Sequence, residues 1–198
     1  FEVSSDANRC WLRAVWFNIL LETPASDFLN VVTNIHQRYR NSGNAHLPTQ
    51  ECNSFFRENN FPQRMRAAYP RMIQQMRDHL EHHTVVRFDH DIEVALCDFS
   101  NFILRPTQAG MINQGTQGDI TQMGHIAAQF PVSTFYRLPM GGLVPLSEHP
   151  SETRAQPIPE NNQIVIKGGN VVGGHFEIFV NQAGREGIMQ KLREKRLS

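Results

Sequence analysis

Residues 6–17 read DANRCWLRAVWF, in which a short polar loop leads through a single cysteine into an apolar segment. From Cys10 to Leu20 the chain contains no Gly or Pro, and its apolar side chains would cover nearly every face of a helix. A helix that is apolar all round is buried in the core rather than lying on the surface. The sequence therefore predicts a central helix that begins at Cys10 and ends near Leu21.

Cys10 stands at the first turn of this predicted helix. The amides at a helix start and the positive end of the helix dipole favour a thiolate over a thiol, and the thiolate is the nucleophilic form. Cys10 is therefore a candidate nucleophile. The alternative is an inert core cysteine, because free Cys is among the most buried residue types. Both interpretations stay open at this point.

The segment 173–180, GGHFEIFV, supplies a possible partner for the cysteine near the other end of the chain. Its polar and apolar residues alternate with a period of two, which predicts a strand with His175 and Glu177 on one face and the apolar side chains packed inward. A thiolate nucleophile needs an imidazole within hydrogen-bond reach and a third group that orients the ring. Cys10, His175 and Glu177 are the candidate catalytic residues.

These segments resemble the motifs of ovarian-tumour (OTU) family deubiquitinases, and of the OTULIN branch in particular. Residues 8–14 match the branch's Asn-x-Cys-x-Leu-Arg-Ala pattern. Residues 175–177 resemble the His-aromatic-Asn/Asp signature, with Glu177 in place of Asn or Asp, and residues 118–136 resemble the helix and strand that precede the histidine. Residues 22–117 match nothing in the family, which keeps open a bacterial or viral effector as the source.

The resemblance implies an α+β fold of the papain-like OTU type, as a single OTU-like catalytic domain over residues 1–198. In that fold a helical N-terminal part, with the cysteine helix, packs on a small C-terminal β-sheet that carries the histidine. The implied activity is a thiol-dependent deubiquitinase that hydrolyses (iso)peptide bonds after the C-terminal glycine of ubiquitin, with a preference for linear chains. Two alternatives remain: a papain-like effector that deamidates or transfers acyl groups, and a non-catalytic ubiquitin-binding module.

The resemblance also assigns roles to the residues around the cysteine. Cys10 attacks the carbonyl, His175 moves the proton, and Glu177 holds the ring, with Asp6 or Asn8 as the alternative orienter. The oxyanion loop is Asp6, Ala7, Asn8 and Arg9, and the substrate channel is lined by Trp11, Gly173 and Gly174. No cofactor is implied.

The composition limits which classes of partner and which cellular compartment we expect. The 198 residues carry nineteen basic and nineteen acidic side chains, so no large positive field favours nucleic acid or a membrane. Three cysteines without a zinc-type spacing are typical of a reducing compartment, here the cytoplasm, or that of the host cell for an effector. No apolar run reaches the roughly 18 residues of a membrane span. We expect a monomer whose partner is ubiquitin or polyubiquitin, and a chain that opens at Phe1 as part of something longer.

Three histidines invite a metal interpretation. His79, His82 and His83 lie three or four residues apart in a predicted helix, a spacing at which side chains can share an ion. We expect no metal there, because no acidic or thiol partner completes the shell and a helix C-terminus already favours histidine through its dipole.

Hydrophobic periodicity predicts the remaining elements. Helices are expected over residues 26–40, 50–59, 63–83, 92–103, 120–130 and 185–197, with Pro70 kinking or splitting the third. Strands are expected over residues 132–138, 163–167 and 175–180, with a glycine-rich hairpin loop between the last two and an irregular connection over 139–162. Caps are expected at Ser26 or Asp27, at Asp89 or Asp91, and at Asp119.

Overall fold

The computed structural model describes residues 6–48, 54–113, 115–131, 135–137, 143–146, 164–167, 175–180 and 184–196. The α-helices are α1 (Cys10–Glu22), α2 (Ala25–Asn41), α3 (Phe61–His82), α4 (His90–Leu104), α5 (Ile120–Ala127) and α6 (Arg185–Glu194). Two short 3-10 turns are η1 (Asp6–Asn8) and η2 (Phe55–Arg57). The strands are β1 (Phe135–Arg137), β2 (Leu143–Pro145), β3 (Ile164–Lys167) and β4 (Glu177–Val180).

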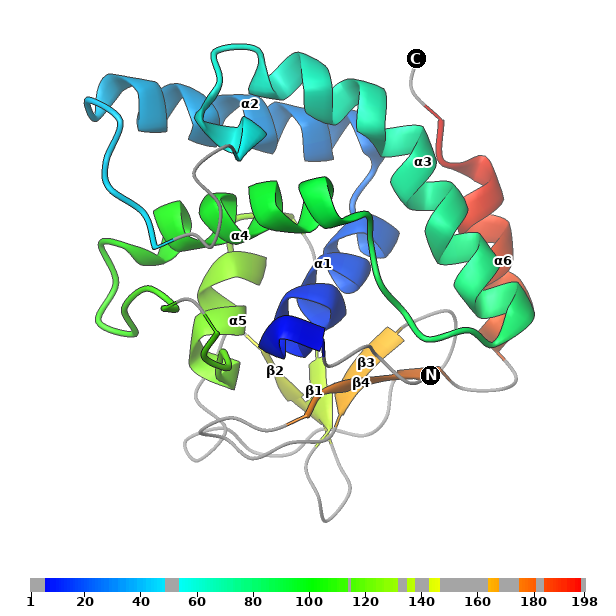
Figure 1. The fold of residues 1–198 in the computed structure, drawn as a ribbon. Coiled ribbons are helices and arrows are strands. Elements are labelled where there is room, and N and C mark those ends of the chain that lie inside the picture. The colour runs from blue at the N-terminus through cyan, green and yellow to red at the C-terminus, as the bar shows by residue number, and fades with distance from the viewer. Residues whose placement is uncertain are drawn as a thin grey trace.

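Helix α1 runs through the middle of the molecule, with α2 and α4 on one side of it and the strands on the other (Figure 1). Every residue from Cys10 to Leu21 is buried, as the continuous apolar run predicted. Trp16 anchors the helix, because its ring lies 5.4 Å from that of Phe99 and 5.5 Å from that of Phe130, centroid to centroid. Its indole N–H donates to Ser100 Oγ at 2.9 Å, so the buried polar end of the ring is satisfied.

Helices α2 and α3 each bury one stripe against this core. In α3 the stripe includes Met65, Met72 and Met76, which confirms the expectation that these methionines are core residues. Helix α3 is not split at Pro70, because it runs as one helix from Phe61 to His82 with the proline inside it, and the alternative, a kink at Pro70, stays a prediction. Pro70 lies on the exposed face, where water can satisfy a backbone carbonyl that lacks its helical N–H partner.

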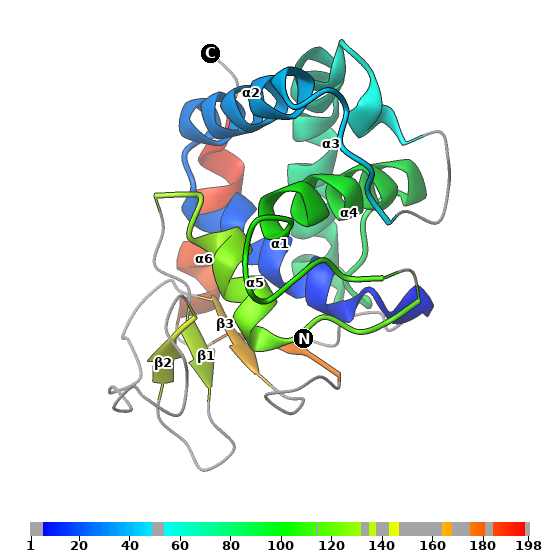
Figure 2. The same ribbon diagram turned by 90° about the vertical axis from the view of Figure 1, so that its left-hand side faces the viewer.

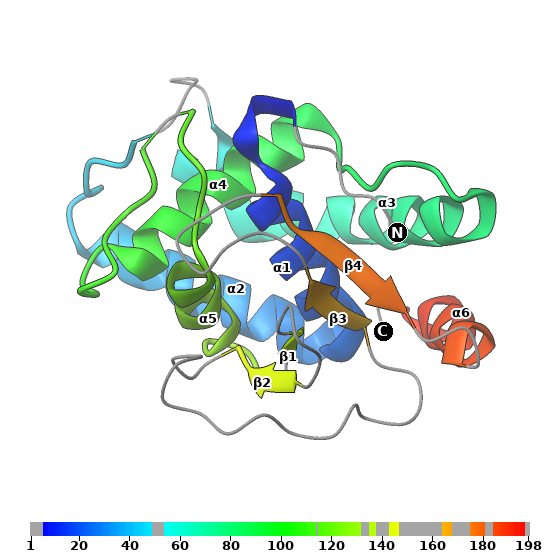
Figure 3. The same ribbon diagram turned by 90° about the horizontal axis from the view of Figure 1, so that it is seen from below.

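The strands form one small mixed sheet in the order β2-β1-β3-β4. Strand β1 pairs with β2 antiparallel and with β3 in parallel, and β3 pairs with β4 antiparallel. The expected pairing of residues 163–167 with 175–180 is therefore confirmed. Strands β3 and β4 lie against α1, below the helices in Figure 2 and nearest the viewer in Figure 3.

The expected α+β papain-like fold is wrong for this chain. The described residues are mainly helical: the helices run from 8 to 22 residues, whereas no described strand exceeds four. His175 is not carried by the sheet, because β4 begins at Glu177. The reason is that the dominant hydrophobic period along the chain is that of a helix, and the short alternating segments near the C-terminus add only a minor sheet.

Of the helix caps expected at Asp119 and at Asp89, one is present and the other is not. The capping box at Asp119 is confirmed: its side chain accepts from the Gln122 amide at 2.8 Å, and the Gln122 side chain accepts from the Asp119 amide at 3.0 Å. Asp89 occupies the N-cap position of α4 but makes no side-chain cap. Its carboxylate instead accepts from Arg71 and Gln75, because α3 brings a charged guanidinium and a side-chain amide within reach.

Other boundaries differ from expectation. Helix α2 begins after Pro24, with no side-chain cap from Ser26 or Asp27. Residues 50–53 of the expected helix 50–59 lie outside the described residues, and the remainder contains only η2. The connection 139–162, expected to be irregular, contains β2. These misses share a cause: short elements are fixed by their tertiary partners rather than by local propensity.

Helix α6 closes the chain as the predicted amphipathic helix. It buries Ile188, Met189 and Leu192 and packs against α3 and α1. Lys195, just after the helix, donates to the Thr23 carbonyl at 2.8 Å and so ties α6 to the end of α1. Among the described residues, no helix combines the length and the apolar character that crossing a membrane requires.

Candidate functional site

The loop before Cys10 has an unusual backbone. Ala7 and Asn8 both have positive φ, 57° and 54°, and neither is a glycine. The left-handed conformation costs an L-residue such as Ala roughly 1–2 kcal/mol, whereas Asn adopts it more readily. Asn8 is held there because its side-chain nitrogen, Nδ2, donates to the Gly115 carbonyl at 2.5 Å. Two consecutive residues of this kind mark the loop as a place where backbone strain is stored, which occurs preferentially at functional sites.

Cys10 follows this loop directly as the first residue of α1, as predicted. Arg9 is the N-cap residue and offers no side-chain cap, so the helix start is defined by the backbone alone. The cysteine is only 1% exposed, so its thiol does not lie on the open surface. A nucleophilic role therefore requires that a substrate gain access to it.

Cys97 differs clearly from Cys10 in its place in the fold. Burial raises the pKa of the Cys97 thiol to about 11, so Cys97 is a neutral thiol near pH 7. Cys52 lies outside the described residues. Of the two described cysteines, Cys10 alone stands at the start of a helix, whereas Cys97 lies within α4.

His175 and Glu177 are brought together at the beginning of β4. Their nearest side-chain atoms, Nε2 and Oε1, are 3.8 Å apart, and both side chains are partly exposed. Phe176 and Ile178 between and beyond them are fully buried, so the predicted alternation of faces is confirmed over these residues. In Figures 1 and 3 the start of β4 lies beside the first turn of α1, which carries Cys10.

Of the residues predicted to line the substrate channel, the structure describes Trp11. Trp11 is 1% exposed, and a Cβ at Gly118 would lie 2.8 Å from its ring, so the indole and the backbone of residue 118 are in tight contact. Trp11 also lines a small cavity of about 20 Å³ with Asn8 and Gly115. Gly173, Gly174 and the Asp6 side chain lie outside the description. The channel and orienting roles assigned to them stay predictions.

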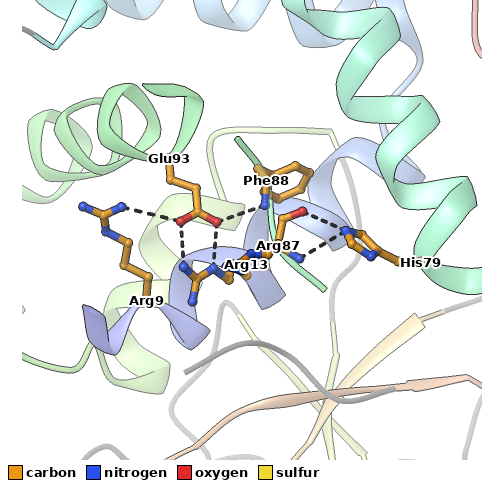
Figure 4. A network of polar contacts seen from close by, with 6 residues as sticks. All are labelled: Arg9, Arg13, His79, Arg87, Phe88 and Glu93. Atoms are coloured by element: carbon orange, nitrogen blue, oxygen red, sulfur yellow. Dashed lines mark hydrogen bonds and ion pairs between the residues drawn. The ribbon is translucent and has the colours of Figure 1, made fainter. Parts of the chain in front are cut away.

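A buried ionic network around Glu93 was missed in the sequence (Figure 4). Arg13 donates from Nε and Nη2 to the two carboxylate oxygens of Glu93, at 2.7 Å each. Arg9 Nη1 lies 3.5 Å from Glu93 Oε1, and the Phe88 amide donates to Oε2 at 3.0 Å. Removing one partner of such a buried pair typically costs about 3–5 kcal/mol. The available signal was two arginines, four residues apart, in or beside an apolar helix, which require a buried acid.

A cavity of about 550 Å³ adjoins this network. Ala7, Arg9 and Arg13 line it from the cysteine loop and the first turn of α1, His90 and Glu93 line it from α4, and His79, His82 and Arg87 are among the residues that line it from α3 and the α3–α4 connection. His79 is fixed there, because its Nδ1 lies 2.6 Å from Thr84 Oγ1 and its Nε2 lies 2.9 Å from the Arg87 carbonyl. The cysteine loop therefore has a polar, histidine-rich cavity on its helical side.

The ground for expecting no metal is wrong in one respect. Asp78, Glu81 and His82 each bring a ligand atom to within 4.8 Å of the others, so acidic partners do stand beside His82. All three side chains are exposed, and exposed carboxylates gather in this way without a metal. The absence of a metal from the mechanism stays a prediction.

No family model matches the chain, and no curated protein or solved structure is significantly similar to it. What the protein does must therefore be inferred from its own residues.

Proposed function

We propose that the protein is a cysteine hydrolase that cleaves the (iso)peptide bond after the C-terminal glycine of ubiquitin. The observation that carries the proposal is the position of Cys10: it begins the central helix directly after a loop, residues 6–9, in which Ala7 and Asn8 have left-handed backbones. The sequence motifs around Cys10 and His175, which resemble those of OTU deubiquitinases, supply the substrate class.

In the proposed reaction the Cys10 sulfur attacks the carbonyl carbon of the terminal glycine. His175 accepts the thiol proton, and amides of the loop 6–9 and of Cys10 stabilise the oxyanion, a contribution of about 3–4 kcal/mol per donor in comparable hydrolases. The C–N bond then breaks, and the amine leaves with the proton from His175. Water hydrolyses the resulting thioester with the same histidine as base, and Glu177 orients the imidazole.

The substrate proposal extends to its surroundings. A Gly-Gly terminus suits a channel too narrow for side chains, for which Trp11, Gly173 and Gly174 are the proposed walls. A preference for linear chains follows from the OTULIN-like motif alone. The enzyme would act as a monomer on ubiquitin or polyubiquitin in the cytoplasm, of the host cell if it is an effector, where the thiol stays reduced.

One observation favours a second candidate, a ubiquitin-binding module without catalysis. Cys10 is 1% exposed, as inert core cysteines are, and the His175–Glu177 separation of 3.8 Å exceeds hydrogen-bond length. In that case the motifs would serve packing and binding, and the thiol would not react with substrate.

The decisive experiment is incubation with a ubiquitin probe that carries a C-terminal electrophile, followed by mass spectrometry. Covalent capture at Cys10, lost in Cys10→Ala and kept in Cys97→Ala and Cys52→Ala, supports the hydrolase. Binding of ubiquitin without capture supports the binding module, and capture at another cysteine contradicts the assigned nucleophile. A panel of ubiquitin dimers of defined linkage then tests the preference for linear chains.

A further inference from the structure

We propose that Glu93 is a positioning residue, which holds the first turn of α1 and thereby the Cys10 thiol in place. The proposal rests on the proposed role of Cys10 as a nucleophile. Glu93 belongs to α4 and acts through two arginines that flank the cysteine in the chain, Arg9 on one side and Arg13 on the other.

The geometry fixes the turn at both ends. Arg9 is the N-cap residue of α1, and the Arg13 amide donates to the Arg9 carbonyl at 3.0 Å, so one helical turn separates the two arginines. Both guanidinium groups converge on the carboxylate of Glu93 (Figure 4). Cys10 lies within the turn that these contacts bracket. A displacement of this turn would therefore move the sulfur and the loop amides together.

Burial makes the arrangement specific. The side chains of Arg13 and Glu93 are only 4% and 3% exposed, and that of Arg9 is 6% exposed. The bidentate contact between Arg13 and Glu93 fixes direction as well as distance. Without the carboxylate, two buried positive charges one turn apart would repel each other, and the one that moves most easily belongs to the loop that precedes Cys10.

The contacts of Arg9 and Arg13 with Glu93 form a clamp on the first turn of α1. This clamp also forms part of the wall of the 550 Å³ cavity. Arg9, Arg13 and Glu93 all line it, together with Ala7 of the strained loop. Loss of the Glu93 charge would therefore leave the arginines facing a space into which they can turn. If Arg9 turned into this cavity, it would pull the loop of residues 6–9 away from its position before Cys10.

A second buried acid on the same helix provides a matched control. Asp98 of α4 is 0% exposed and accepts from Arg57 Nε at 3.0 Å, but Arg57 belongs to η2 and not to α1. Glu93→Gln and Asp98→Asn both neutralise a buried carboxylate of α4 without changing its size. A purely structural role for Glu93 predicts that the two variants behave alike at equal folded fraction.

The experiment measures two rates at a temperature where circular dichroism shows the variants folded. One is capture by the ubiquitin probe, separated into maximal rate and half-saturation, and the other is alkylation of Cys10 by iodoacetamide, located by mass spectrometry. For Glu93→Gln we expect maximal capture at least tenfold slower with half-saturation unchanged, and alkylation at least threefold faster because the turn opens. For Asp98→Asn we expect both rates within twofold of the unmutated protein.

Wild-type capture rates for Glu93→Gln, or equal losses in Asp98→Asn, would overturn the proposal. If Glu93→Gln does not fold, Arg9→Gln decides, because it leaves the Arg13–Glu93 pair intact and should show the same two opposite changes, each of smaller size. If the unmutated protein is not captured at all, the proposed hydrolase fails. The alkylation rates still decide the clamp in that case, since they need no ubiquitin.

Discussion

The Nε2 atom of His175 lies 3.8 Å from Oε1 of Glu177, at the point where β4 begins. This is too long for a hydrogen bond but within the range of an ion pair when the imidazole carries a proton. Both side chains are more than a third exposed, so water screens the attraction. A shift of about 1 Å would make the contact a hydrogen bond, and the role of Glu177 depends on that shift in the complex with substrate.

Replacing His175 by Ala should abolish cleavage of ubiquitin dimers to about the same extent as Cys10→Ala. Nucleophile and base act as a unit, so the loss of either removes the same step, and their losses do not add. The measurement is kcat for dimer cleavage by both single variants and the double variant. A double variant far slower than either single one would mean that the two residues act independently.

Replacing Glu177 by Ala should lower activity less than loss of the nucleophile, roughly 10⁴-fold against 10⁶-fold in kcat in triads of known type. Glu177→Gln keeps the length and an acceptor and should retain more activity than the Ala variant. Glu177→Asn places here the residue that is common at the matching position of the OTU signature, and it should be at least partly active.

An unchanged rate in Glu177→Ala would show that another residue orients His175. The structure favours one of the two alternative orienting residues, Asp6 and Asn8, over the other. The side-chain nitrogen of Asn8, Nδ2, already donates to the Gly115 carbonyl, which ties this side chain to the neighbouring loop. Asp6 would then be the first alternative to mutate.

Replacing Ala7 by Gly tests whether the loop before Cys10 is strained. Gly adopts positive φ without the penalty of roughly 1–2 kcal/mol, but it loses about 0.5–1 kcal/mol through the greater entropy of the unfolded chain. We expect a net stabilisation of up to about 1 kcal/mol, or a rise of roughly 2–4 °C in Tm for a protein of this size.

The matched control for this variant is Ala67→Gly. Ala67 is exposed within α3, where Gly should destabilise by about 1 kcal/mol because the backbone is helical. Equal destabilisation by both substitutions, in thermal unfolding followed by circular dichroism, would contradict the left-handed conformation of Ala7.

The sequence predicted those parts of the site and fold that depend on neighbouring residues. The helix from Cys10 follows from an uninterrupted apolar run, and the start of α5 follows from the Asp119 and Gln122 pair. The inward packing of Phe176 and Ile178 follows from simple alternation. In each case the signal and its structural consequence lie within a few residues of each other.

What the sequence missed depends on residues far apart in the chain. Arg13 and Glu93 are 80 residues apart, so neither residue alone reveals a buried clamp. Asp89 was expected to cap its own helix, but Arg71 and Gln75 of α3 compete successfully for its carboxylate. The fold class was wrong for a different reason: the hydrophobic period along most of the chain is that of a helix, and strands such as β3 and β4 are only four residues long.

The last prediction concerns pH and Lys195, where the chain following α6 meets the end of α1. Lys195 donates to the Thr23 carbonyl, and burial lowers its pKa from 10.5 to about 8. Between pH 8 and pH 10.5 the unfolded chain therefore holds a proton that the folded protein has released. Because the unfolded state binds more protons there, the free energy of unfolding should rise with pH across this window, and below it this contribution should be constant.

Lys195→Met removes this titration, and the neighbouring half-buried Glu22, whose pKa burial raises, is present in both proteins. The measurement is the free energy of unfolding in urea at pH 7, 8, 9 and 10 for both proteins, taken as their difference so that titrating groups that do not interact with Lys195 cancel. We expect the stability of Lys195→Met relative to the unmutated protein to be greatest at pH 7 and to decline above about pH 8 toward pH 10. A difference that does not change with pH would mean that Lys195 titrates alike in the folded and unfolded states, and that its amine is not desolvated by packing against α1.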